Sequence, residues 1–447
     1  MKKIFHLLLL QCYALLSLAQ VTVKNPLTEN LVNPTGIDVQ PRFSWQLFSD
    51  KRNVMQTAYE IRVSDSPSTL AKASVWSSGK ITSDQSLFIS YGGPALQSGK
   101  KYFWQVRVWD TSNKASAWSE SASFQMGMLK SSDWKARWIT QGFADDTVNR
   151  PSPYFRKTFS SNKKVASATA YITALGMYEA FVNGKRIGDA YLTPGWTSYN
   201  NRLQYQVYDV TNLITTGNNA IGAVLGSGWY RGFIGFSGQK NFYGKELALL
   251  MQLEISYSDG TKETIITDES WKSSTGSIVS SEIYHGETID ARLEKTGWNT
   301  ASFNDSNWNT VKLYTAKSPN LIATYNEPIR KRETFKASKL IITPKGERVL
   351  DFGQNLVGWV QVKIKGNAGD KITLYHAEVL DKFGNFYTEN LRPAKQRNEY
   401  ILKGGGEEFF EPHFTFQGFR YIRIEDYPGE INPENYQLTS ADQSVTT

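Results

Sequence analysis

The chain has 447 residues, of which 13% are aromatic and 21% charged, and its formal net charge is +8 at pH 7. This length supplies about two to four domains with separate cores. The basic residues are scattered, and the densest run is the Arg-Lys-Arg of residues 330–332. Because nucleic-acid binding needs a basic patch or stripe, we exclude that class of function and expect a solvated surface of mixed charge.

Residues 1–19 have the pattern of a secretory signal peptide. Two lysines precede an apolar run, and Ser17 and Ala19 supply the small residues of a cleavage site. The segment is too short and wrongly flanked for a membrane anchor, so we expect no membrane span. The only cysteine, Cys12, lies in this segment. A mature chain without disulfides fits an exported protein in the periplasm or at the cell surface.

Residues 21–128 predict a β-sandwich. Tyr59, Ile61 and Val63 alternate with Glu60 and Arg62, which is the period of a half-buried strand. The segments PRFSW, AYEIRVSDS and YFWQVRVWD resemble a fibronectin type III domain. Such modules are mostly spacers and packing partners, so we assign no chemistry to this region.

A second sandwich is predicted over residues 136–318. Residues 177–182 alternate with period two, and Asn183-Gly184 follows as a two-residue hairpin turn. A long loop then leads to predicted strands at residues 204–211 and 220–225, with a turn at residues 217–219 between them. Loops this aromatic and polar on a strand scaffold are typical recognition sites.

The same stretch carries a family resemblance. VNGKRIGD, LTPGWTSY, the DVT strand and GSGWYRG resemble the carbohydrate-binding jelly roll that precedes the catalytic barrel in bacterial α-L-rhamnosidases. Residues 297–308 contain a WxxxxFxDxxW-like pattern, which is typical of galactose-binding-like jelly rolls.

A third all-β region is predicted over residues 325–440. Val360, Val362 and Ile364 alternate with polar residues. DFGQNLVGW, YHAEVLD and EPHFTFQGFRYIRIE are very similar to the β-sandwich that sits against the barrel in bacterial α-L-rhamnosidases. No run of ten or more residues after the signal has helical periodicity. The expected fold class is therefore all-β, with tandem sandwiches and without the catalytic (α/α)6 barrel.

The resemblance implies an inverting glycoside hydrolase whose acid and base carboxylates lie on that barrel, in motifs of the DCPQRDER kind. No such motif occurs in this sequence, and inversion needs two carboxylates roughly 6.5–9.5 Å apart. For Glu287 and Asp290 we expect a structural or calcium-linked role. Glu407 and Glu408 should face opposite sides of a strand at the surface. We therefore predict no catalytic residue and no activity of this chain alone.

Sugar binding is the chemistry that remains. A rhamnose site needs an aromatic wall and amide or guanidinium donors. Within the segments that match the family, the predicted sugar-binding residues are Asn183, Trp196, Tyr199, Asn200, Trp229, Tyr230 and Arg231. The alternative is that Trp229 and Tyr230 are core or rim residues.

The jelly roll is also considered for a calcium site. The jelly roll is similar to modules that bind rhamnose with calcium, yet Val182 precedes Asn183 where an acidic residue is expected. We therefore predict no required cofactor and leave calcium in the jelly roll open. No histidine pair has the i, i+4 spacing of a zinc site.

Three hypotheses follow for function. The first is the non-catalytic N-terminal part of an exported α-L-rhamnosidase that hydrolyses terminal α-L-rhamnosyl residues of plant or bacterial glycans. Its partners would be a rhamnose-containing glycan and a separately encoded catalytic barrel. The second is a stand-alone carbohydrate-binding or adhesin-like β-sandwich protein. The third is an active hydrolase with carboxylates on the sandwiches.

Overall fold

The computed structural model describes residues 21–235, 238–316 and 320–442, so the predicted signal peptide lies outside the described residues. The chain divides into two compact units between Ser131 and Ser132. Strands dominate both units, and the longest stretch of α-helix in the described residues is the four-residue helix α1 (Gly228–Arg231). The all-β prediction is confirmed. No helix among these residues is long and apolar enough to cross a membrane.

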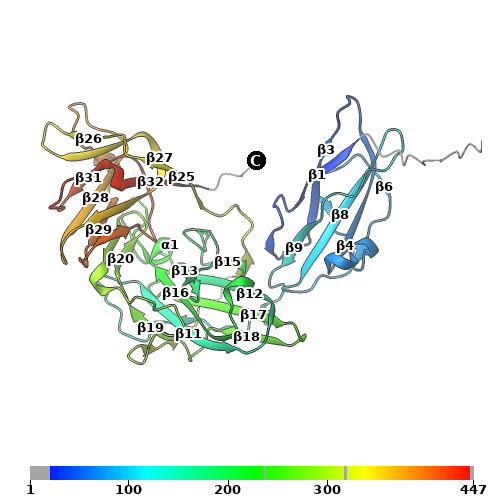
Figure 1. Ribbon diagram of the computed structural model, residues 1–447, viewed down its shortest axis with the longest axis horizontal. Helices are drawn as coiled ribbons and strands as arrows, with labels where there is room; N and C mark the ends of the chain where they lie inside the picture. Colours follow the sequence, from blue (N-terminus) through cyan, green and yellow to red (C-terminus); the bar gives the residue numbers. More distant parts are fainter. Residues whose placement is uncertain (1–20, 236–237, 317–319, 443–447) are drawn as a thin grey trace, which may run out of the picture. The chain divides into compact units, whose positions relative to one another are not determined.

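The first unit is a sandwich of two sheets, drawn in blue and cyan in Figure 1. One sheet has the order β1-β3-β7, with bounds Thr22–Thr28, Arg42–Phe48 and Ile89–Ser90. The other has the order β2-β9-β8-β4-β5, with β6 beside β4: Thr35–Ile37, Ala122–Met126, Lys101–Asp110, Gln56–Ser64, Trp76–Ser77 and Ile81–Thr82. Short 3-10 helices are Pro67–Lys72 and, at the unit boundary, Ser131–Asp133. Phe43 and Trp104 are fully buried between the sheets, and the Trp104 indole donates to the Thr28 hydroxyl.

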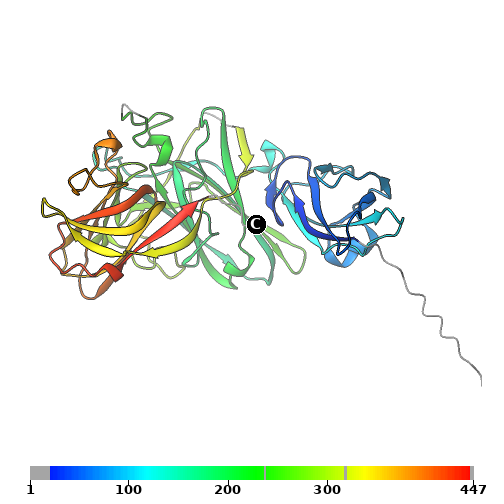
Figure 2. The same cartoon turned by 90° about the horizontal axis from the view of Figure 1, so that it is seen from above.

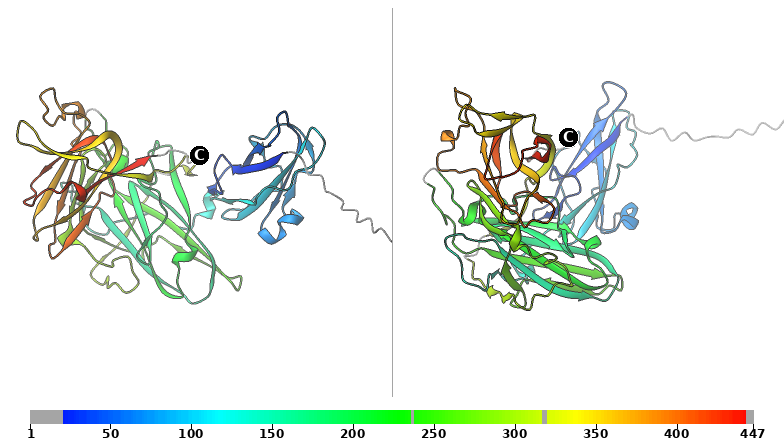
Figure 3. Two further views of the ribbon diagram at one scale, coloured as in Figure 1. Left: turned by 45° about the horizontal axis from the view of Figure 1, so that its top comes forward. Right: turned by 60° about the vertical axis from the view of Figure 1, so that its left-hand side comes forward.

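The second unit begins with the jelly roll, whose two sheets are mostly green in Figure 3. The first sheet has the order β23-β10-β17-β12-β15-β24, with β18 beside β17: Lys312–Leu313, Ile139–Thr140, Ala248–Tyr257, Val165–Leu175, Arg202–Asp209, Asn320–Ala323 and Lys262–Ile266. The second has the order β14-β13-β16-β11-β19-β22: Lys185–Arg186, Met177–Val182, Gly217–Gly226, Pro153–Ser161, Lys272–Thr275 and Asn309–Thr310. Two 3-10 helices, Thr211–Leu213 and Ala291–Leu293, interrupt its loops.

The predicted hairpin turn at Asn183-Gly184 is confirmed. Val182 pairs with Lys185 across it, and both turn residues have positive φ, 50° and 81°. The predicted turn at residues 217–219 is wrong, because these residues already begin β16 and pair with β11. The reversal lies just before them, where the Asn219 side chain accepts from Thr215 N and donates to Thr215 O.

The third region forms one ten-stranded sheet, whose yellow and red strands lie side by side in Figure 2. Its order is β20-β21-β29-β28-β31-β27-β32-β25, with β26 and β30 beside β27: Ile278–Glu282, Gly286–Asp290, Arg397–Ile401, Lys371–Ala377, Gln417–Glu425, Arg348–Lys365, Tyr436–Asp442, Arg330–Lys336, Lys339–Ile342 and Glu407–Phe410. The 3-10 helices are Glu389–Leu391 and Pro433–Asn435.

This sheet connects the third region to the jelly roll. The hairpin β20–β21 comes from the jelly-roll part of the sequence, yet β21 pairs in parallel with β29. Strand β27 is 18 residues long and pairs with β31 on both sides of a register shift between Asp351 and Leu356. Its first half also pairs with β26, and its second half with β32 and β30. One continuous hydrophobic core runs through both regions. The shared hairpin and the continuous core explain why the two regions form a single unit.

Candidate functional site

The sequence GSGWYRG folds into the loop that follows β16 and carries helix α1. Gly226 and Gly228 are required there, because a Cβ on either would overlap the side chain of Phe414 or Met177, and Gly228 has φ 52°. The three larger residues, Trp229, Tyr230 and Arg231, follow one another on the helix. Since each residue of a helix turns by about 100°, their side chains point in three different directions.

Trp229 forms one side of an aromatic pair. Its ring stacks on Trp196 with centroids 5.9 Å apart and planes inclined by 6°. Trp229 is buried, and its indole donates to the Tyr284 hydroxyl at 3.0 Å. Trp196 is 53% exposed, and its indole contacts the Tyr243 hydroxyl at 3.2 Å. The stack leaves the outer face of Trp196 open to solvent as a flat apolar surface in a fixed orientation.

Tyr230 belongs to a cluster of tyrosines beneath this pair. Its ring and that of Tyr243 both pack against Tyr199, at 5.5 Å and 4.9 Å. The Tyr199 hydroxyl donates to Gly195 O at 2.8 Å, which fixes the loop that carries Trp196. Burial raises the pKa of both Tyr199 and Tyr230. The two tyrosines therefore support the loop and present no face to solvent.

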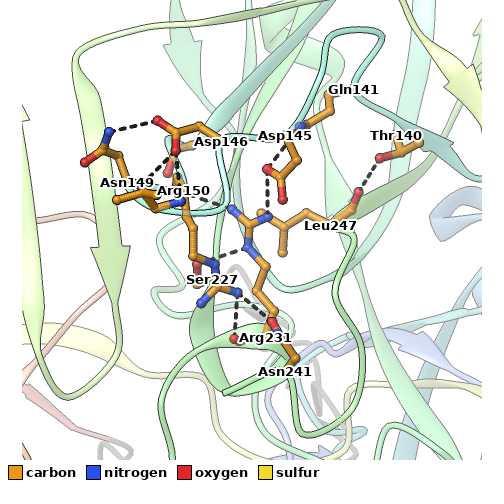
Figure 4. A network of polar contacts seen from close by, with 12 residues as sticks. Thr140, Gln141, Asp145, Asp146, Asn149, Arg150, Ser227, Arg231, Asn241 and Leu247 are labelled. Carbon is orange, nitrogen blue, oxygen red and sulfur yellow. Dashed lines mark hydrogen bonds and ion pairs between the residues drawn. The ribbon is translucent and has the colours of Figure 1, made fainter. Parts of the chain in front are cut away.

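Arg231 points into a buried polar network, shown in Figure 4. Its Nε donates to the Ser227 hydroxyl at 3.2 Å, and its Nη1 lies 3.5 Å from Asp145 Oδ1. Arg150 is also buried, and each arginine donates to the backbone carbonyl of the other. Glu282 pairs with Arg150 at 3.0 Å and accepts from the backbone N–H of residue 233.

The electrostatics of this network follow from its burial. Burial and the neighbouring Arg150 lower the pKa of Arg231 to about 10. Burial also raises the pKa of Glu282. Two buried guanidinium groups thus share one buried carboxylate, and the second acid, Asp145, is only partly buried, with 34% of its side chain exposed.

The remaining predicted residues lie elsewhere in the loop system. Asn200 is exposed in the turn after Tyr199. Asn183 lies beyond the far end of β13, since Met177 pairs with Gly226 near α1 and Val182 pairs with Ile221. The structure therefore brings five of the seven predicted residues together around α1 and separates Asn183 from them. None of these positions tests sugar binding itself, so the roles stay predictions.

The Asn183 side chain is fully engaged in the fold. Its amide nitrogen donates to Leu213 O and Asn219 Oδ1, and its oxygen accepts from Ala220 N. The amide nitrogen is no calcium ligand, and the oxygen already accepts the backbone N–H of Ala220. The described residues also contain no group of three or more His, Cys, Asp or Glu side chains placed to hold a metal. Nothing at Asn183 fits calcium.

We expect Asn183→Ala to lower the free energy of unfolding by about 2 kcal/mol, because it removes three hydrogen bonds and places alanine at positive φ. Urea denaturation measures the loss, and the sugar affinity of the folded protein should not change. Asn183→Gly, which tolerates the turn, should recover part of the stability. A drop in affinity at unchanged stability would instead assign Asn183 to the sugar site.

The acidic pairs considered in the sequence have structural surroundings. Glu287 is buried, and one of its oxygens accepts from the backbone N–H groups of His413 and Phe414. Asp290 caps a 3-10 helix and pairs with the side chain two residues later. Glu407 and Glu408 do face opposite sides of β30. The expected surface position of Glu408 is wrong, because Glu408 is buried and accepts two backbone N–H groups of the preceding loop.

An apolar cavity of about 300 Å³ lies next to Tyr284. Its walls include the rings of Phe233 and His285, which pack 4.8 Å apart, and Leu391 and Pro393 from the third region. Burial lowers the pKa of His285. This cavity and the Trp196 stack are connected through the Trp229–Tyr284 hydrogen bond.

Sequence reasoning missed the partners that fix these side chains. They are Tyr243, Tyr284, Asp145, Arg150 and Glu282. Arg150 and Glu282 lie 132 residues apart in the chain, and no local pattern connects them.

Three family models match the chain in order. They are the Rha78A-like N-terminal immunoglobulin domain over residues 23–130, the alpha-L-rhamnosidase N-terminal domain over 163–333, and the bacterial alpha-L-rhamnosidase concanavalin-like domain over 341–441. The chain belongs to the bacterial α-L-rhamnosidase family and corresponds to its N-terminal β-sandwich half. The first sandwich, expected to be fibronectin III-like, matches an immunoglobulin domain, which shares that two-sheet architecture.

The chain is also similar in sequence to individual α-L-rhamnosidases. The chain is 38% identical over 420 residues to the enzyme of Formosa agariphila and 30% identical over 582 residues to that of Streptomyces avermitilis. These alignments cover 91% and 92% of the chain but 45% and 56% of the relatives. The chain thus spans about half the length of the curated relatives that it matches.

Solved structures of α-L-rhamnosidases have the same fold. The structure from Streptomyces avermitilis, complexed with L-rhamnose, superposes with a TM-score of 0.88 at 29% identity, over 95% of this chain and 57% of that one. The structure from Dictyoglumus thermophilum also gives 0.88, at 38% identity, over 94% of this chain and 48% of that one.

Proposed function

We propose that the chain is the non-catalytic N-terminal part of an exported α-L-rhamnosidase that hydrolyses terminal α-L-rhamnosyl residues of plant or bacterial glycans. The observation that carries this proposal is the ordered match of all three β regions to α-L-rhamnosidases. The described residues contain no helical barrel, and their buried carboxylates are engaged in structural contacts. The contribution of these regions is to support the catalytic part and to bind sugar.

The sugar-binding part of the proposal rests on Trp196. A pyranose ring has one face of C–H groups that packs on an aromatic ring, and Trp196 offers an open face of this kind. Its stack on Trp229 and its contact with Tyr243 hold the ring in place before any ligand arrives. A preorganised ring loses little conformational entropy on binding. Trp229 and Tyr230, in contrast, are buried packing residues: Trp229 stacks on Trp196, and Tyr230 packs against Tyr199.

We expect Trp196→Ala to weaken the binding of methyl α-L-rhamnoside about tenfold, because the stacking surface disappears. Calorimetric titration of the full chain measures the change. Phe383→Ala is a matched control, since Phe383 is also an exposed aromatic residue, 67% exposed, but lies in the third region. Equal affinity of the Trp196 variant and the unaltered chain would contradict a stacking role.

Turnover separates this proposal from its alternatives. The pure chain should release no rhamnose from an aryl rhamnoside. Addition of an α-L-rhamnosidase barrel in trans should restore hydrolysis if the chain is part of such an enzyme. It should have no effect on a stand-alone carbohydrate-binding or adhesin-like protein, which is the second candidate. Release of rhamnose by the chain alone would support a hydrolase that uses carboxylates of the sandwiches.

A further inference from the structure

A second cavity lies beside α1, and both charged and apolar side chains line it. It has a volume of about 200 Å³, and its walls include Gln141, Phe143, Asp145, Arg231, Glu246 and Lys312. Arg231 follows Trp229 by two positions, a rotation of about 200° on a helix, so the two side chains leave α1 on opposite sides. This cavity is therefore distinct from the Trp196 surface.

Arg231 gives the cavity a fixed donor. The side chain is 1% exposed, and the arrangement in Figure 4 holds its guanidinium group in place through Ser227 and Arg150. A guanidinium group has five N–H donors. The guanidinium group of Arg231 makes three contacts with the protein, to the Ser227 hydroxyl, Arg150 O and Asp145. The contacts to Arg150 O and Asp145 are long, at 3.4 Å and 3.5 Å. Arg231 therefore reaches the cavity with donors that the protein does not saturate.

Asp145 supplies an acceptor on the same wall. Its Oδ1 accepts from the Gln141 side-chain amide at 3.2 Å and also faces Arg231. The carboxylate and the guanidinium are thus held side by side, as an acceptor next to a donor. Two neighbouring hydroxyl groups of one ring can bind such a pair together, one donating to the carboxylate and the other accepting from the guanidinium.

The charges of the cavity favour an uncharged ligand. Arg231 and Lys312 are opposed by Asp145 and Glu246, so the charged walls cancel. An anionic ligand would find two carboxylates in the walls, whereas a neutral polyol meets donors and acceptors without a charge conflict. Phe143 adds an apolar patch for the C–H face of a ring. The volume lies below the roughly 300–1,000 Å³ of sites for drug-sized ligands, which matches a single small ring.

We propose that the Arg231–Asp145 cavity binds one neutral monosaccharide unit through a pair of adjacent hydroxyl groups. This inference rests on the proposed function, because it adds a second sugar site to the one at Trp196. The two sites share helix α1 and bind different parts of a glycan. The chain would then hold two sugar units at once, which raises the apparent affinity for a branched or repeating glycan.

Titration of the full chain with methyl α-L-rhamnoside tests the cavity. We expect two equivalents of sugar to bind, and Asp145→Asn to weaken one of them about tenfold while Trp196→Ala weakens the other. Asp145→Asn keeps the shape of the side chain and lies at a partly exposed position, so the fold should survive. Glu269→Gln, at an exposed ion pair with Arg137, is the matched control for loss of one negative charge.

The number of sugar equivalents that the chain and its variants bind distinguishes the two sites. A single equivalent that is sensitive to Trp196→Ala and unaffected by Asp145→Asn would overturn the cavity site and leave the proposed function intact. A single equivalent lost in Asp145→Asn would support the cavity and overturn the stacking site. No binding to the unaltered chain would overturn both. Tighter binding of methyl α-D-galactopyranosiduronate than of the neutral glycoside would overturn the choice of an uncharged ligand.

Discussion

Replacement of Arg156 by alanine is expected to lower the free energy of unfolding of the second unit by about 2–4 kcal/mol. The Arg156 side chain is fully buried, and it donates to Trp298 O at 2.8 Å and Thr300 O at 2.9 Å and pairs with Asp305. These three acceptors all lie in residues 297–308. Loss of the guanidinium would leave the two carbonyl groups without their donor, and Asp305, whose side chain is 24% exposed, would keep only Lys272 at 3.8 Å as a cationic partner. Urea denaturation followed by tryptophan fluorescence measures the effect.

Two control variants make the Arg156 prediction specific. Arg137→Ala removes an ion pair whose side chains are both more than half exposed and should cost less than about 1 kcal/mol. Arg156→Lys keeps the charge but lacks the planar fork and should remain destabilised. Hydrogen exchange should speed up first in residues 297–308. A loss below 1 kcal/mol for Arg156→Ala would show that the aromatic contacts alone hold this segment.

The same segment shows what the sequence could predict. Its WxxxxFxDxxW-like pattern indicated a jelly roll, and the structure places Trp298 and Trp308 in a stack against Tyr154. The pattern also contains Asp305, but not the residue that binds it. Arg156 precedes Asp305 by 149 residues, on β11. Local patterns predict strands and tight turns because neighbours in the chain decide them, whereas buried ion pairs depend on the whole fold.

The candidate site was predictable to the same extent. A loop with Trp, Tyr and Arg after a strand indicated recognition, and these side chains do gather around α1. Exposure was not predictable, since Trp196 is 53% exposed while its stacking partner Trp229 is 6% exposed. Burial of Arg231 depends on Arg150, which lies 81 residues earlier in the chain and accepts a hydrogen bond from Arg231 through its backbone carbonyl. The position of β20 and β21 in the third sheet has the same cause, since β21 pairs with a strand more than a hundred residues later.

The contact between the jelly roll and the third region brings together Glu179, Glu287 and His413, which no sequence pattern connected. His413 Nδ1 lies 2.9 Å from Glu179 Oε2, and the backbone N–H of His413 donates to Glu287 Oε2 at 2.7 Å. Burial of Glu179 opposes its ionisation, but the charge and hydrogen bond of His413 outweigh this and lower its pKa. Arg186 and Lys331 add further positive charge around Glu179, and Glu411 adds negative charge around His413. Ionisation at this contact should therefore affect the stability of the whole second unit.

The stability of the second unit should fall as the pH rises from about 4.5 to 9. Burial raises the pKa of Glu287 to about 7, so the folded protein keeps a proton that the unfolded chain has lost above pH 4.5. The free energy of unfolding falls with pH wherever the folded state binds more protons. Burial of His413 opposes its protonation, but attraction to Glu179 outweighs this and raises its pKa to about 9. The stability from that pair is complete below pH 6.5 and is lost as the pH rises to 9.

Glu287→Gln tests the first part of this pH dependence. Glutamine can still accept from the two backbone N–H groups but cannot ionise, so the decline between pH 4.5 and 7, roughly 3 kcal/mol, should disappear. His413→Gln should remove the decline between pH 6.5 and 9 and steepen the decline at lower pH, because loss of the imidazolium charge raises the pKa of both Glu179 and Glu287. Glu269→Gln at the exposed pair should change neither slope. Urea midpoints at intervals across this range measure both slopes.

If Glu287→Gln kept the decline below pH 7, a different buried acid would be its source. Glu282, whose pKa burial also raises, is the next residue to replace, and its loss would act through the arginine network of α1 instead.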